Sequence, residues 1–132
     1  MRAVCRRVAL GILLVGAACA SDSTGTGSGA GTLILRLATP HDDDGAVLFE
    51  VSGPPIDTLV SVNASLRLFT RRADGSTIVG AVVGVVAEGA VITLRVPDIG
   101  AAARYTARIR EVADRDNVLR ASLAGYALTV SR

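Results

Sequence analysis

From Thr32 onward, hydrophobic and polar residues alternate with a period of two in several short segments. Such alternation places one set of side chains in a core and the other in water, which is typical of β-strands with one solvated face. The inward positions are Leu33, Leu35 and Leu37; Val47, Phe49 and Val51; Leu66 and Leu68; Ile92, Leu94 and Val96; and Tyr126, Leu128 and Val130. The pattern predicts an all-β domain over residues 32–132.

Turn-forming residues separate these segments, among them Asp44-Gly45, Asp74-Gly75, Glu88-Gly89 and Pro97-Asp98. Aspartate, glycine and proline favour tight turns because they supply side-chain hydrogen bonds, positive φ or a fixed φ. Short strands joined by frequent turns are typical of antiparallel sheets. We therefore predict a single antiparallel β-sandwich of about seven to nine strands.

Two segments leave alternatives open. Residues 78–87 are apolar on both faces and contain Gly80 and Gly84, which predicts either one central strand or two short strands that kink at a glycine. Residues 98–113 fit either a helix capped by Asp98 or a short turn followed by a strand. We favour the turn and strand, in which Tyr105, Ala107 and Ile109 point inward and Arg104, Arg108 and Arg110 point outward.

The N-terminal segment does not follow the strand pattern. Arginines at positions 2, 6 and 7 precede an unbroken apolar run over residues 8–18, which is the layout of a secretory signal peptide. The run is shorter than the roughly 20 residues that a transmembrane helix needs. Residues 19–31 are rich in Ser, Thr and Gly and have little to bury, so we expect a flexible linker.

The small residues Ala17 and Ala18 before Cys19 resemble the lipobox of bacterial lipoproteins, although Gly16 stands where that family prefers Leu. In that family, cleavage makes the Cys the new N-terminus, and this Cys carries the acyl chains. The resemblance implies a signal peptide over residues 1–18 and a bilayer anchor on Cys19. It also implies the outer membrane or cell surface, because Ala20 follows the Cys. Ordinary secretion is the alternative, since residues 18–20 also fit an A-x-A cleavage site.

The order of the predicted strands loosely resembles cohesin-like bacterial β-sandwich domains. Residues 45–51 are similar to an early strand of that fold, residues 90–98 to a late strand and its crossover, and residues 125–130 to the closing strand. The resemblance covers most of residues 32–132. It implies the sandwich fold and carries over no binding residue.

Charge and cysteine content exclude several classes of function. The first 18 residues hold three of the 14 basic residues and none of the 12 acidic ones. The remaining chain therefore has 11 basic and 12 acidic residues and a net charge of −1. A near-neutral chain lacks the basic footprint of nucleic-acid binding. Cys5 leaves with the signal peptide, and Cys19 is then the only thiol. This excludes an intramolecular disulfide, a CxxC redox motif and a Cys-based metal cluster.

The only histidine, His41, precedes three aspartates, Asp42, Asp43 and Asp44. As a general base, His41 would need a partnered nucleophile, and none is identifiable; the alternative is a solvated turn. The three carboxylates are hard oxygen ligands of the kind that calcium prefers, and residues 114–117 form a second acidic loop. Each loop is also a typical polar hairpin connection. We predict no enzyme and no cofactor, and we favour a polar loop over the alternative of calcium at Asp42, Asp43 and Asp44.

Phe69 is out of phase with Leu66 and Leu68, so we expect its ring to be exposed. With the outward residues Arg104, Arg108 and Arg110, it forms a candidate face for an envelope protein or polysaccharide; the alternative is a solvated strand face whose arginines are balanced by acids. The leading hypothesis is a membrane-tethered, non-catalytic binding module. A structural envelope component with no dedicated ligand comes second.

Overall fold

The computed structural model describes residues 28–132. The predicted signal peptide, Cys19 and most of the predicted linker lie outside these residues. The described chain forms β1 (Gly31–Ala38), β2 (Asp44–Ser52), β3 (Thr58–Ser61), β4 (Arg67–Arg72), β5 (Thr77–Val86), β6 (Gly89–Val96), the 3₁₀ helix η1 (Ile99–Arg104), β7 (Thr106–Asp114) and β8 (Ala127–Ser131). In this part of the chain, no helix is long and apolar enough to cross a membrane.

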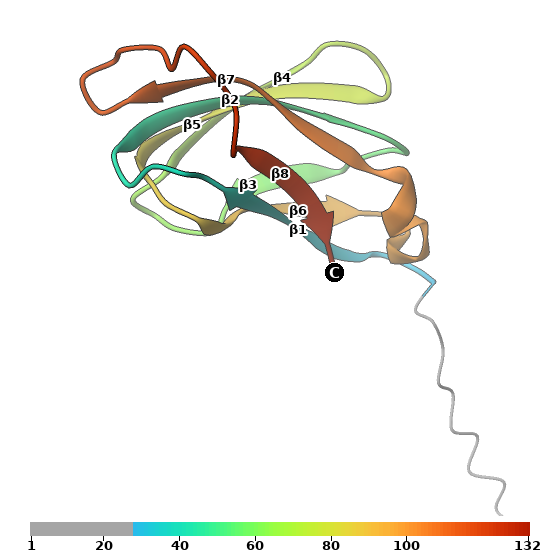
Figure 1. Ribbon diagram of the computed structural model, residues 1–132. Coiled ribbons are helices and arrows are strands. Elements are labelled where there is room, and N and C mark those ends of the chain that lie inside the picture. The colour runs from blue at the N-terminus through green and yellow to red at the C-terminus, as the bar shows by residue number, and fades with distance from the viewer. Residues whose placement is uncertain (1–27) are drawn as a thin grey trace, which may run out of the picture.

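The strands form two four-stranded sheets that pack face to face (Figure 1). One sheet has the order β3-β6-β1-β8 and the other the order β4-β5-β2-β7, and every pairing is antiparallel. The first two strands therefore take central places in different sheets. The predicted antiparallel all-β sandwich is confirmed.

The core lies between the sheets and is built from the predicted inward positions. The three leucines of β1, the alternating residues Val47, Phe49 and Val51 of β2, and the alternating residues of β6 are all buried. Phe49 is the largest fully buried side chain. Alternation predicts these positions because each strand has one face toward the facing sheet.

The segment that is apolar on both faces is one central strand, β5, between β4 and β2. Ile78, Val82 and Val86 are buried in the core, while Val83 and Val85 are exposed. The ladder with β2 shifts near the C-terminal end of β5, where Gly84 has a φ of 143°. Glycine adopts this backbone region without steric cost, so the strand bulges at Gly84 and continues.

Residues 98–113 adopt the favoured turn and strand. The Asp98 carboxylate accepts a hydrogen bond from the Gly100 amide at 2.8 Å and caps the short helix η1. Tyr105 is buried, and its hydroxyl donates to the Pro55 carbonyl at 2.9 Å. Ala107 and Ile109 are half-buried, and the arginines at 104, 108 and 110 are exposed, as predicted.

The predicted linker over residues 19–31 is too long at its C-terminal end. The Ile99 amide donates to the Gly29 carbonyl at 2.8 Å, and the Gly29 amide donates to the Asp98 carboxylate at 3.3 Å. Gly31 begins β1, and a Cβ at Gly31 would lie 2.9 Å from Ile99 Cδ1. Backbone hydrogen bonds hold Gly29 and Gly31 in place although neither has a side chain to bury. Residues 29–31 therefore belong to the domain.

The two ends of the sandwich differ in what they hold. One end, which we call the base, holds Ser28, η1 and the loops over residues 53–57 and 73–76. The opposite end, which we call the apex, holds the loops over residues 39–43, 62–66, 87–88 and 115–126. Figure 1 shows the loop before β8 at the end opposite η1. The described chain therefore enters the domain at the base.

Candidate functional site

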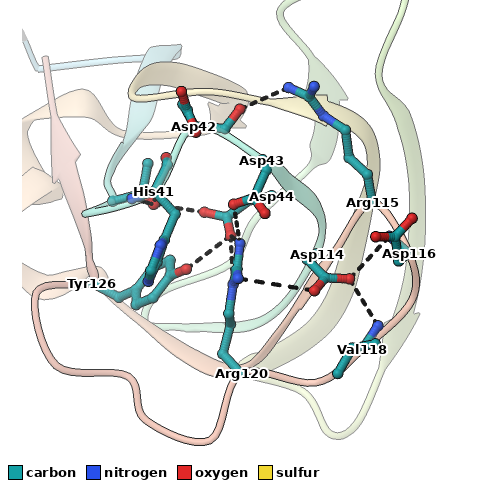
Figure 2. A network of polar contacts seen from close by, with 11 residues as sticks. His41, Asp42, Asp43, Asp44, Asp114, Arg115, Asp116, Val118, Arg120 and Tyr126 are labelled. Atoms are coloured by element: carbon teal, nitrogen blue, oxygen red, sulfur yellow. Dashed lines mark hydrogen bonds and ion pairs between the residues drawn. The ribbon is translucent and has the colours of Figure 1, made fainter.

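The two acidic loops meet at the apex, around the buried carboxylate of Asp44 (Figure 2). Asp44 has 0% exposure and is the only buried charged residue in the described chain. Its carboxylate accepts hydrogen bonds from the Thr39 hydroxyl at 2.6 Å and from the Tyr126 hydroxyl at 2.8 Å. The Arg120 guanidinium donates to it from Nε at 3.2 Å and from Nη2 at 3.0 Å. A buried charge is tolerated when it is paired and fully hydrogen-bonded, and Asp44 meets both conditions.

Arg120 joins three carboxylates, from the end of the loop before β2, the start of β2 and the end of β7. Besides Asp44, its guanidinium donates to Asp43 and lies 3.9 Å from the Asp114 carboxylate. Its backbone amide donates to the Val112 carbonyl at 2.8 Å, so the residue is fixed at both ends. The arginine therefore holds the loop before β8 against the loop between β1 and β2.

Hydrogen bonds decide the ionisation of Asp44. Burial by itself would raise the pKa of Asp44, but the hydrogen bonds from Thr39, Tyr126 and Arg120 and the charge of Arg120 hold it below its usual range. Burial would lower the pKa of Arg120, and the carboxylates of Asp44 and Asp43 raise it instead. Asp44 is thus ionised and Arg120 charged at neutral pH.

The candidate calcium ligands lie in this network. The backbone carbonyl of Asp42 accepts from Arg115 at 2.7 Å, and the carboxylates of Asp43 and Asp44 face Arg120. In the second acidic loop, the Asp114 carboxylate accepts from the amides of Asp116 and Val118 at 2.9 Å. Residues 28–132 hold no cluster of three or more His, Cys, Asp or Glu placed for a metal ion. Calcium at Asp42, Asp43 and Asp44 stays an alternative, and the cation that the structure places there is Arg120.

His41 lies at the edge of this network and packs against Tyr126, with ring centroids 5.8 Å apart (Figure 2). It lines an open hollow with Asp42 and Glu88. In the described chain, no acid or nucleophile is hydrogen-bonded to its ring; the backbone amide of His41 donates to the Thr39 hydroxyl at 3.0 Å. His41 thus lies exposed in the turn between β1 and β2.

A second feature is the solvent-facing side of the sheet β4-β5-β2-β7, which we call the Phe69 face. Residues paired directly across an antiparallel sheet share a face. One row of paired residues runs Arg67, Val83, Ala46, Ala113 and Leu119. The next row runs Phe69, Ala81, Leu48 and Glu111. The two rows form a contiguous, mostly apolar patch, in which Phe69 is 59% and Leu119 61% exposed.

The charged residues of the Phe69 face lie nearer the base. Glu50 accepts hydrogen bonds from Arg110 and, at 3.0 Å, from Arg108. Both bonds lower the pKa of Glu50, and the bond from Arg110 has the larger effect. Glu50 is therefore paired with two arginines of β7. Of the predicted ligand residues, Phe69 lies on the edge strand β4, and Arg108 and Arg110 lie across the sheet on β7. Arg104 lies apart from them in η1 at the base.

The solvent-facing side of the other sheet is different. Its rows hold mainly threonine and arginine, with Ile34 and Val60 as its large apolar residues: Thr32, Arg95 and Thr58; Ile34, Thr93 and Val60; and Arg36 and Thr129. Phe69, Val83 and Leu119 are exposed on the Phe69 face, whereas Val60 is the only exposed large apolar residue in these rows of the other described sheet.

The fold and these sites define a small, two-layer antiparallel β-sandwich with a buried ionic network at one end and one apolar outer face. Comparison of the chain with protein-family models, curated proteins and solved structures finds no match. The likeness to cohesin-like sandwiches therefore stays a prediction for everything beyond the all-β sandwich itself.

Proposed function

We propose that this protein is an exported bacterial lipoprotein, anchored in the outer membrane through an acylated Cys19, whose β-sandwich is a non-catalytic binding module. The basic residues, the apolar run and the small residues before Cys19 support the anchor. The entry of the chain at the base supports the module, because a tether at the base leaves the apex and both outer faces open to the envelope.

The observation that carries this proposal is the apolar patch on the Phe69 face. Monomeric proteins rarely expose large contiguous apolar patches, and such patches mark interaction sites. A structural component with no ligand would be expected to have two polar outer faces, and here only one is polar. Because the patch offers one phenylalanine and the chain has no tryptophan, an envelope protein fits it better than a polysaccharide.

The anchor is tested by the intact mass of the mature protein from the membrane fraction. We expect a chain that begins at Cys19 and carries acyl groups, and a Cys19→Ser variant that is not acylated. A bare chain that begins at Ser21 in the soluble fraction would replace the anchored module with a freely secreted one.

The binding face is tested by photo-crosslinking in the cell. A photoreactive phenylalanine analogue at position 69 is expected to give a discrete adduct with an envelope protein after irradiation. The same analogue at Thr129, which is exposed on the opposite outer face, is the matched control. Absence of an adduct at position 69, or equal adducts at both positions, would contradict a binding role for the Phe69 face.

A further inference from the structure

The edge strand β4 is open along its outer side. It pairs with β5 alone, and no other backbone segment in the described chain completes its ladder. Of the other edges, β3 has 4 residues and β8 has 5. Residues 118–120 hydrogen-bond along the apical end of β7, and the arginines on the rest of that edge, Arg108 and Arg110, are already paired with Glu50. β4 has 6 residues, which is a usual strand length, and an open edge of this length can accept another strand.

On the Phe69 face, β4 presents one aromatic and two basic side chains. Arg67, Phe69 and Arg71 point to this face, and all three are exposed. Neither arginine forms an ion pair with any residue between 28 and 132. The edge therefore presents an aromatic ring between two unneutralised positive charges.

This order of charges selects the partner. A second copy of β4 paired antiparallel about Phe69 would place Arg67 of each copy opposite Arg71 of the other, and parallel pairing in register would also oppose arginines. Like charges directly opposite each other destabilise a strand pair, whereas opposite charges and aromatic–apolar pairs stabilise it. The charges disfavour self-pairing and favour an acidic partner.

We propose that β4 binds an extended segment of a partner protein by strand addition, and that this segment carries an acidic, an apolar and a second acidic residue at alternate positions. The acidic side chains lie opposite Arg67 and Arg71, and the apolar side chain packs on Phe69. Backbone hydrogen bonds along β4 supply affinity and the three side chains supply specificity. The inference rests on the proposed role of the Phe69 face and names the partner and its mode of binding.

The test uses a capped heptapeptide, Thr-Glu-Thr-Trp-Thr-Glu-Thr, and the mature chain from residue 19 with Cys19→Ser. All buried core residues of the described chain lie between Leu33 and Leu128, so this chain keeps the whole domain. Because the protein has no tryptophan, the peptide fluorescence reports binding directly. We expect saturable binding, which falls at least about tenfold in Arg67→Glu/Arg71→Glu. A peptide with Lys in place of Glu is expected to bind that variant and not the parent.

Two controls separate strand addition from general charge attraction. Arg36→Glu/Arg95→Glu, on the opposite outer face, is expected to leave the affinity unchanged. Amides of alternate residues point to the same edge of a strand, so N-methylation of either the Glu and Trp residues or the Thr residues places methyl groups on one edge only. One of these two peptides is expected to lose binding and the other to keep it.

Three results would overturn the inference: no saturable binding of the Glu peptide, equal binding of the Lys peptide by the parent chain, or equal binding of both N-methylated peptides. In the first case the arginines serve only to keep β4 from pairing. A discrete adduct at position 69 in cells together with any of these results would leave the binding role of the Phe69 face intact and remove strand addition alone.

Discussion

Asp44→Ala is expected to lower the free energy of unfolding by about 3–5 kcal/mol, because it breaks a buried charge pair by removing one partner. The substitution leaves the hydroxyls of Thr39 and Tyr126 and part of the Arg120 guanidinium without their acceptor. Small domains are stable by only about 5–15 kcal/mol, so the loss is a large fraction of the total. Urea denaturation of parent and variant measures it.

Glu50→Ala is the matched control, because Glu50 also binds two arginines but does so at the surface. Solvent and salt screen an exposed pair, so its urea midpoint is expected to move far less. Equal shifts for the two variants would show that burial of Asp44 does not determine its contribution.

The same network gives stability a pH dependence. The pKa of Asp44 is lower in the folded chain than in the unfolded one, so its contribution is present above the unfolded value of about 3.9 and is lost as pH falls through the lowered folded value. We expect the unfolding free energy of the parent to drop below about pH 4, with a smaller drop in Asp44→Asn. Identical pH profiles would assign the acid sensitivity to other carboxylates.

Gly80→Ala is expected to destabilise the domain by about 1–3 kcal/mol, the usual cost of overpacking a core. Gly80 lies opposite Phe49 in the β2–β5 ladder, and a Cβ there would clash with Phe49 Cζ. The ring fills the space that the missing side chain leaves, so the two residues form one packing unit.

A double-mutant cycle with Phe49→Leu tests this unit. The shorter Leu makes room for a methyl group, so the double variant is expected to be more stable than the sum of the single effects predicts. Gly75→Ala is the control, because a Cβ at Gly75 meets no atom within 4 Å. A strictly additive cycle, or an equal loss at Gly75, would contradict the packing explanation.

Local pattern was sufficient to predict every described strand except β3, which has only 4 residues, and most of the core. Each strand has one face toward the opposite sheet, so apolar residues occupy alternate positions, as they do in β1 and β6. The exposure of Phe69 followed from the same phase argument. The ambiguity over residues 98–113 was resolved by tertiary packing, since Tyr105 is buried only when a strand follows the turn.

The apical network and the full apolar patch were not predictable in this way. Arg120 lies 76 residues from Asp44, and nothing near either residue marks the other as its partner. Asp44 resembled any turn aspartate before a glycine. Val83 and Leu119 join the patch around Phe69 only through the order of the strands, which alternation does not encode.

For a chain exported as proposed, the strand order has a consequence for how the domain acquires its structure. β1 hydrogen-bonds β6 and β8, and β2 hydrogen-bonds β5 and β7, so the central strands of both sheets take partners from the second half of the chain. A chain that crosses a membrane N-terminus first delivers β1 and β2 before these partners arrive. Pairing of β1 and β2 must then wait until β6 and β5 have crossed, and pairing between distant strands is slow. In the interval the apolar strands are unpaired, so aggregation competes with folding until the second half of the domain arrives.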